Sequence, residues 1–310
     1  MLALAASPAG AQQPAKVPRV GYFGGGNPRS PVFDSFRQGL RELSYVDGQN
    51  IVIEHRPYNG DPQLYNSASE LVRLNVDAIV AQGGESVLAA MKATKTIPIV
   101  IIIPNAAPFV ASLERPGGNV TGVSGLTAEL GGKWLELLKE TVPSMKRIAG
   151  FWNQRAENKL PIWKSVELAA RSLGVELEWL EVRGFRGEIA RRFRSAIWAG
   201  ADAFIVLPGF GSFENMTEMI ELAKKNRLPG IFWASSLAER GGLMSYGGNI
   251  REQSRRAAYV LDKILKGAKP SDLPVERPTQ FELVINLKTA KEIGVTIHPE
   301  VLMWADRVIK

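Results

Sequence analysis

The chain has 310 residues and no cysteine, which excludes thiol catalysis, disulfide bonds and cysteine-based metal sites. It has only two histidines, His55 and His298, which lie far apart in the sequence. Isolated histidines of this kind are more often structural or exposed than a metal pair or a catalytic base. The chain thus offers few side chains for acid–base, nucleophilic or metal chemistry, and we expect neither an enzyme nor a bound metal.

Long apolar runs are also scarce, because no segment reaches the roughly 18 uninterrupted apolar residues of a membrane span. The N-terminus carries one short apolar stretch, with Ala9 and Ala11 in the spacing that a signal peptidase accepts. We interpret residues 1–16 as the remnant of a secretory signal and its lead, and an alanine-rich tail is the alternative. The lack of cysteine agrees with export to the periplasm.

Basic residues outnumber acidic ones by 38 to 31, which gives a formal net charge of +7 at pH 7. Much of the excess lies in two stretches with helical patterning, at Arg183, Arg186, Arg191, Arg192 and Arg194 and at Arg251, Arg255 and Arg256. We assign these arginines to solvated helix surfaces. No aromatic platform or recognition-helix pattern accompanies them, so we expect no nucleic-acid partner.

Six short apolar runs, three in each half of the chain, have the composition of buried strands. They span residues 20–23, 77–80, 98–103, 147–152, 203–207 and 230–233. Each run ends in a loop rich in glycine, asparagine, serine or aromatic residues, and no such loop carries a histidine or a carboxylate pair. With 45% hydrophobic residues, the chain can bury a large core and is longer than one compact domain needs, so we expect two lobes.

Between these runs, hydrophobic residues recur with the period of amphipathic helices. The clearest case begins with Ser30 as N-cap and Pro31 at the first helical position, followed on one face by Phe33, Phe36 and Leu40. Strands and helices that alternate in both halves predict an α/β protein of two Rossmann-like lobes with parallel sheets. Because ligands bind beyond the carboxyl ends of such strands, we expect the six loops to face one another across a cleft.

Glycine- and proline-rich stretches interrupt the pattern at residues 115–122, 240–248 and 270–278. We expect the chain to cross between the lobes there, so that three segments form a hinge that favours closure around a ligand. The predicted N-terminal lobe comprises residues 17–123 and 247–277, and the predicted C-terminal lobe comprises residues 124–246 and 278–310.

A dinucleotide-binding fingerprint begins at Gly24 and Gly26 but is incomplete. Arg29 stands where the third glycine is required, and Pro28 and Pro31 crowd the turn. The sequence also has no phosphate-binding loop ending in Gly-Lys-Ser/Thr. We therefore expect no nicotinamide or other cofactor.

Seven tryptophans raise the separate question of an aromatic pocket. Trp152 and Trp233 end predicted strands and could reach the cleft. The following tryptophans lie in or beside helix and strand patterns and are expected to pack inside: Trp134, Trp163, Trp179 and Trp198.

Several longer stretches carry a resemblance to a known family, namely residues 36–43, 48–51, 112–122, 241–247, 262–270 and 281–286. From Val17 to the C-terminus, the chain resembles the ABC-transporter substrate-binding proteins of the group that includes tryptophan-type amino-acid binders. The resemblance implies the periplasmic-binding-protein type I fold. It also implies an exported protein, which we expect to be a monomer, that captures a small-molecule solute for a cognate ABC permease in the inner membrane.

Two loops depart from the family pattern. Many relatives have an Asp-Pro-Val-rich loop after the third strand, whereas residues 104–109 here read Pro-Asn-Ala-Ala-Pro-Phe. Amino-acid binders of the group tend to offer Asp or Asn after Leu207, whereas residues 208–212 here read Pro-Gly-Phe-Gly-Ser. These departures weaken an amino-acid assignment. Glu85 could supply an acidic partner from the opposite lobe, or it could face solvent at a helix start.

The candidate ligand-binding residues follow the predicted strands or lie at the crossings. Gly83, Gly84 and Ser86 are expected to offer hydrogen-bond donors at a helix start, which suits a carboxylate. The full set is Phe23, Gly24, Gly25, Asn27, Gly83, Gly84, Glu85, Ser86, Pro104, Asn105, Ser124, Asn153, Pro208, Phe210, Trp233, Ser235 and Tyr246.

Aromatic surface at Phe23, Trp152, Phe210 and Trp233 favours a small aromatic or branched apolar carboxylate or amino acid as the solute. The sequence thus predicts the extracytoplasmic solute-binding component of an ABC importer. The alternative is a ligand-sensing effector domain of a regulatory or signalling system. A regulator would need a DNA-binding headpiece, for which the residues before Val17 are too few.

Overall fold

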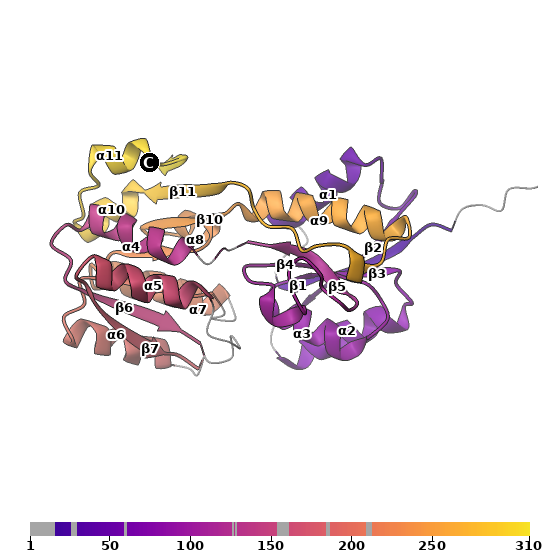
Figure 1. Cartoon of the computed structure of the whole chain (residues 1–310), viewed down its shortest axis with the longest axis horizontal. Coiled ribbons are helices and arrows are strands. Elements are labelled where there is room, and N and C mark those ends of the chain that lie inside the picture. Colours follow the sequence, from indigo (N-terminus) through magenta and orange to yellow (C-terminus); the bar gives the residue numbers. More distant parts are fainter. Residues whose placement is uncertain are drawn as a thin grey trace, which may run out of the picture.

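The structure is a computed structural model that describes residues 16–25, 30–58, 61–125, 127, 129–153, 161–183, 187–208 and 213–310. These residues form two α/β lobes that lie side by side (Figure 1). The first lobe contains the N-terminal part of the chain together with α9 (Ile250–Leu265), and the second contains the middle part together with the C-terminus (Figure 1). The predicted architecture of two α/β lobes is confirmed.

The described strands of the first lobe form a parallel sheet in the order β2-β1-β3-β4-β5. All three apolar runs of the first half fall in this sheet, in β1, β3 and β4. The strands are β1 (Arg19–Gly25), β2 (Val52–Tyr58), β3 (Ala78–Gln82), β4 (Ile99–Ile103) and β5 (Val120–Ser124).

The second sheet has the order β12-β11-β10-β9-β8-β6-β7. Among the described strands of this sheet, β10 and β11 pair antiparallel and the other pairs are parallel. The antiparallel pair departs from the predicted parallel sheets. The strands are β6 (Arg147–Trp152), β7 (Glu176–Glu181), β8 (Ala203–Val206), β9 (Gly230–Phe232), β10 (Met244–Gly248), β11 (Phe281–Asn286) and β12 (Arg307–Ile309).

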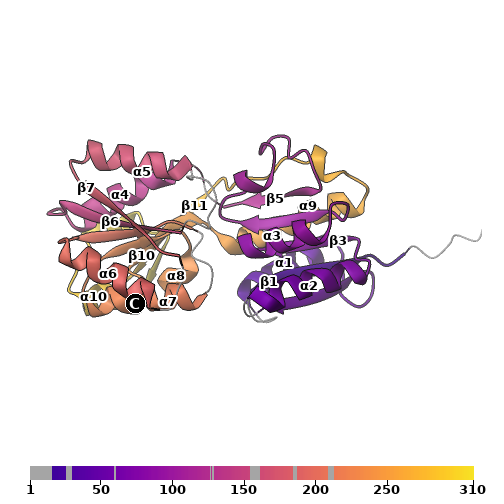
Figure 2. The same cartoon turned by 90° about the horizontal axis from the view of Figure 1, so that it is seen from below.

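Helices cover both faces of each sheet. Buried side chains of α1 and α9 pack on one face of the first sheet, and those of α2 and α3 pack on the other. In the second lobe, α4 and α5 lie on one face and α6 and α7 on the other (Figure 2). The α-helices are α1 (Pro31–Glu42), α2 (Asp61–Arg73), α3 (Gly84–Ala93), α4 (Leu130–Thr141), α5 (Pro161–Ser172), α6 (Glu188–Trp198), α7 (Phe213–Lys225), α8 (Ser235–Glu239), α9 (Ile250–Leu265), α10 (Leu287–Ile293) and α11 (Pro299–Met303).

Two short 3₁₀ helices, η1 (Ala107–Phe109) and η2 (Pro270–Asp272), complete the regular structure of the described residues. None of the described helices has the length and apolar composition needed to cross a bilayer.

The start of α1 follows the sequence signal. The Ser30 hydroxyl oxygen accepts a hydrogen bond from the Phe33 backbone N–H at 3.2 Å, and Pro31 occupies the first turn. Phe33, Phe36 and Leu40 are buried on the face that packs against α9. The predicted N-cap and apolar face are therefore confirmed.

The chain crosses between the sheets after β5, after β10 and before β11. The third crossing follows Glu276, whose backbone N–H donates to the Gly122 carbonyl oxygen in β5 at 2.8 Å. The predicted lobe boundary between residues 246 and 247 falls inside β10, because that strand continues to Gly248 and pairs with β11. The second crossing therefore lies two residues later than the sequence indicated.

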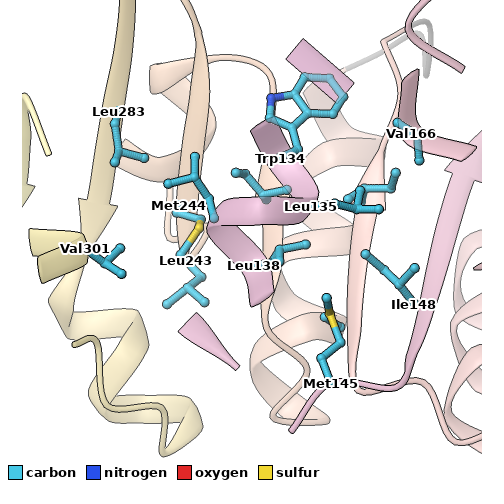
Figure 3. Packing of buried hydrophobic residues seen from close by; sticks show 14 of the residues in the cluster. Trp134, Leu135, Leu138, Met145, Ile148, Val166, Leu243, Met244, Leu283 and Val301 are labelled. Atoms are coloured by element: carbon cyan, nitrogen blue, oxygen red, sulfur yellow. The ribbon is translucent and has the colours of Figure 1, made fainter. Parts of the chain in front are cut away.

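The core of the second lobe is built around Trp134 on α4 (Figure 3). Its side chain is 0% exposed, contributes to a cluster that includes Leu138 and Met244, and donates from Nε1 to the Tyr246 carbonyl oxygen at 2.6 Å. A large aromatic side chain with a satisfied N–H contributes both apolar burial and a fixed hydrogen bond. Trp134 therefore ties α4 to β10.

The other tryptophans that we expect to pack inside differ in their burial. Trp163 and Trp179 stack with ring centroids 3.8 Å apart, so they pack as predicted. Trp198 is 87% exposed at the end of α6, and the prediction that it packs inside is wrong. Hydrophobic periodicity predicts a helix that reaches Trp198, but it does not predict the direction of a side chain in the last turn of that helix.

Replacing Trp134 with alanine should destabilise the second lobe by about 3–5 kcal/mol, because it leaves a cavity and an unpaired Tyr246 carbonyl. The measurement is the free energy of unfolding from denaturant titration. Trp198→Ala is the matched control and should change the free energy by no more than about 0.5 kcal/mol. Equal effects of the two substitutions would contradict the assigned packing.

Candidate functional site

The carboxyl ends of the principal strands meet at the junction between the lobes. The chain leaves the first sheet at the carboxyl end of β5, which is parallel to β4, β3 and β1. It leaves the second sheet at the carboxyl end of β10, which is parallel to β9, β8 and β6. Since α/β sheets bind ligands at these edges, the candidate site lies between the lobes.

In the first lobe, the turn from β3 into α3 leaves open space at this edge. Gly83 is the N-cap of α3 and has φ 90°, a conformation that favours glycine. Gly83 has no side chain with which to cap α3, and beyond its chain neighbours no described atom lies within 4 Å of the position that a methyl group on Gly83 would take. The start of α3 therefore has open space beside it, where the positive end of the helix dipole attracts an anion.

The two side chains that follow have different surroundings. Ser86 is 0% exposed, and its hydroxyl donates to the Gln82 carbonyl oxygen at 2.8 Å. This bond uses the hydroxyl proton of Ser86, so the hydroxyl would have to leave Gln82 in order to donate to a ligand as predicted. Glu85 lies half-buried in the first turn of α3.

At the end of β1, Phe23 is 0% exposed and packs in the core with Leu64 and Leu71. The expected aromatic surface at Phe23 is therefore absent from the edge, because alternation along β1 turns this side chain toward α2 and α3. Gly24 and Gly25 are the last two residues of the strand, and Gly24 is the register partner of Gln82.

Side chains after β4 and in β5 mainly support the loop between these strands. Ser124 is 1% exposed, donates to the Pro104 carbonyl oxygen at 3.2 Å and accepts from the Ala106 N–H at 3.3 Å. Both contacts are internal, so Ser124 shapes the edge and is not exposed to a solute. Asn105 is half-buried, and its Oδ1 accepts from the Ala107 N–H at 3.3 Å.

The second lobe contributes a mixture of buried and accessible groups. Asn153 is 5% exposed and Pro208 is buried. Ser235 is half-exposed and begins α8 directly after β9. Tyr246 is half-buried with its ring 5.9 Å from that of Phe281, which holds it against β11.

Aromatic surface at the edge is smaller than the sequence suggested. Trp152 is half-buried and lies edge-on to Trp163 with ring centroids 5.1 Å apart. Trp233 is half-buried where the two core clusters of the second lobe meet. The predicted residues Asn27 and Phe210 lie outside the described residues.

The three crossings meet beside Gly248, where the side chain of Gln253 from the first turn of α9 also lies. A methyl group on Gly248 would lie 2.6 Å from Gln253 Nε2, 2.8 Å from the Gly125 carbonyl oxygen and 3.1 Å from Pro278. Gln253 is 4% exposed, and its Oε1 has no hydrogen-bond partner among the described residues. We call Gly125, Gly248, Gln253 and Pro278 the hinge cluster. Nothing in the sequence marked Gln253.

An ion pair also joins the lobes beside the hinge cluster. Glu239, at the end of α8, lies 3.3 Å from Arg251 on α9 and 2.6 Å from Arg307 on β12. Arg251 is about half exposed, so the pair contributes little free energy. Glu239 nevertheless connects the helix that follows β9 to the helix that packs on the first sheet.

These features define a class: a two-lobed α/β protein whose opposed strand ends carry backbone amides, amide side chains and half-buried tryptophans. Within the described residues, no group of His, Asp and Glu side chains could hold a metal ion.

Comparison with known proteins gives the family. Residues 26–309 match the family described as ABC transporter substrate binding protein, so the chain belongs to that family, which is non-enzymatic. The chain is 28% identical over 273 residues to the tyrosine-binding protein of Clostridioides difficile, with 86% of this chain and 78% of that protein covered.

Solved structures agree. An ABC domain from Streptococcus pneumoniae in complex with L-Trp matches with a TM-score of 0.84 and 26% identity, covering 95% of this chain and 100% of that chain. The leucine-binding protein LivK from Thermotoga maritima matches with a TM-score of 0.58 and 15% identity, covering 89% of this chain and 87% of that chain. The latter likeness shows the fold alone, which is of the periplasmic-binding-protein type I.

Replacing Gly248 with alanine should destabilise the protein by about 1–3 kcal/mol, because the added methyl overlaps Gln253 and the Gly125 carbonyl. Gly118→Ala is the control, since a methyl group there meets no described atom within 4 Å and the backbone has no positive φ. That variant should be unchanged or slightly stabilised. Thermal unfolding checks both, and a Gly248 variant as stable as the control would contradict the tight hinge cluster.

Proposed function

We propose that this chain captures a small aromatic or branched apolar carboxylate, with L-tryptophan and L-tyrosine as the first candidates, for delivery to an ABC permease. The family relationship supplies the transport role. The relatives are a tyrosine-binding protein and a domain in complex with L-Trp, which supports an aromatic amino acid as the solute.

The observation that carries this proposal is the uncapped start of α3. Gly83, the N-cap residue, has no side chain with which to cap the helix, and the space beside it is open. A carboxylate satisfies such N–H groups and interacts favourably with the helix dipole. Across the junction, Trp233 is the partly exposed aromatic group that follows β9 and can contact an apolar side chain.

Further hydrogen bonds are assigned to Asn105, Asn153 and Ser235, which follow β4, β6 and β9. The proposed acidic partner for a ligand ammonium group is Glu85, since it lies half-buried beside Gly84 in the first turn of α3. A half-buried carboxylate near a bound ammonium would strengthen binding of an amino acid over a simple acid.

We further propose that the chain works in the periplasm as a monomer, and that residues 1–16 belong to the export signal and its lead. The family is one of extracytoplasmic binding proteins, which supports this location. The partner is then a cognate permease of the inner membrane.

L-Tryptophan or L-tyrosine should raise the melting temperature of the protein. At a ligand concentration of 100 times the dissociation constant, binding adds about 2.7 kcal/mol of stability. Differential scanning fluorimetry checks the result against branched-chain amino acids, sugars and polyamines. Stabilisation by sugars or polyamines, with no response to carboxylates, would refute the proposed solute class.

The same titration with Asn105→Ala tests the site, because loss of a hydrogen bond to the solute should weaken binding by about 1–3 kcal/mol. Asn226→Ala is the control: Asn226 is exposed, and its side-chain amide donates to the Leu222 carbonyl oxygen within α7. Its affinity should equal that of the wild type.

Saturating ligand should also lower the radius of gyration, because only a closed form lets both edges contact one small molecule. Small-angle scattering with and without L-tryptophan measures this, with a sugar as the control that leaves the curve unchanged. Identical curves for the bound and free protein would contradict closure.

A further inference from the structure

One side chain at the open edge of the first sheet has received no role so far. Gln82 is the last residue of β3 and directly precedes Gly83. Its side chain is half-buried, and its Oε1 accepts a hydrogen bond from the Tyr22 hydroxyl at 2.9 Å. The direction of this hydrogen bond determines which atoms of the Gln82 amide are left to bind a ligand.

Tyr22 is held firmly in place. Its side chain is 1% exposed, and its ring lies 4.5 Å from that of Phe33 and 5.2 Å from that of Phe36, measured between centroids. Burial raises the pKa of the Tyr22 phenol. The hydroxyl therefore stays protonated at neutral pH and remains a hydrogen-bond donor.

A phenol that donates must face the carbonyl oxygen of the amide. Gln82 Oε1 is thereby directed toward Tyr22, and the NH₂ group is directed away from it. Within the described residues, the Gln82 side chain makes no other hydrogen bond. Its two N–H donors thus remain available for an acceptor.

The neighbouring strand leaves room for this arrangement. Gly24 is the register partner of Gln82, and a methyl group there would lie 3.0 Å from Gln82 Cβ and 3.4 Å from Oε1. Contacts at these distances are tight enough to displace the Gln82 side chain. The absence of a side chain at Gly24 therefore preserves the bond between Tyr22 and Gln82.

We propose that Gln82 binds the solute directly, donating from Nε2 to its carboxylate, and that Tyr22 is the positioning residue that orients the amide. This inference rests on the proposed function, because it assigns a donor to the same carboxylate that approaches Gly83. An amide whose oxygen is already bonded presents donors alone, so it favours a carboxylate over a group that itself donates.

The test compares wild type, Gln82→Glu and Tyr22→Phe by calorimetry with two probes, L-tryptophan and L-tryptophanamide, in which a carboxamide replaces the carboxylate. Gln82→Glu keeps the size of the side chain but replaces the donor with a negative charge. It should weaken L-tryptophan binding about 10–100-fold and L-tryptophanamide binding much less. The preference for the carboxylate should therefore shrink.

Tyr22→Phe should weaken L-tryptophan binding about 3–10-fold in the wild-type background and have no further effect in the Gln82→Glu background. Tyr45→Phe is the matched control, since it removes a hydroxyl of the same lobe that donates to Asp262 Oδ1 at 3.0 Å. The control should leave both affinities unchanged. Melting temperatures of all variants, measured without ligand, separate loss of binding from loss of fold.

Unchanged binding by Gln82→Glu, or equal loss for both probes together with a lower melting temperature, would overturn the inference and leave the proposed function standing. If wild-type protein binds neither L-tryptophan nor L-tyrosine, the proposed solute fails and the inference fails with it. A shared effect of Tyr22→Phe and Tyr45→Phe would reduce the role of Tyr22 to stability alone.

Discussion

The close contact of three chain crossings beside Gly248 and Gln253 is the constraint on which the arrangement of the two lobes depends. Gly125, Gly248 and Pro278 each lie against Gln253 or one another at distances that leave no room for an added methyl group on either glycine. Because the crossings are this close, the carboxyl edges of the two sheets stay opposed. The buried and unpaired Oε1 of Gln253 is a cost of this packing, since a buried acceptor without a partner destabilises a fold.

Most polar side chains at the first-lobe edge are already used by the protein itself. Ser86 and Ser124 donate to backbone carbonyl oxygens, and Phe23 belongs to the core. The groups that we propose for the ligand at this edge are the backbone at the start of α3 and the side chains of Gln82, Glu85 and Asn105. Recognition by hydrogen bonds and charge fits a family that binds solutes and does not transform them.

Arginines of the basic stretches are likewise engaged by other groups of the protein. Arginines of the two basic stretches form ion pairs with nearby carboxylates, in the pairs Arg183–Glu181, Arg191–Glu188, Arg251–Glu239, Arg255–Glu42 and Arg256–Glu276. Pairing disperses the charge over helix surfaces and loops, so these arginines do not form one open basic face. Arg256 and Arg251 also attach α9 to the third crossing and to α8, respectively, which adds to the hinge cluster.

The sequence by itself determined the alternation of strands and helices and the N-cap at Ser30. These follow from local rules, namely side-chain period, capping chemistry and the conformational demands of glycine and proline. Tertiary structure decided in which direction individual side chains point. Phe23 in β1 is buried, Trp198 at the end of α6 is exposed, and the Gln82 amide oxygen accepts from Tyr22, because strand register and helix packing set side-chain direction. Gly125, Gly248 and Pro278 meet through contacts between distant parts of the chain, since Gly125 and Gly248 are more than a hundred residues apart. Local sequence patterns do not predict such contacts.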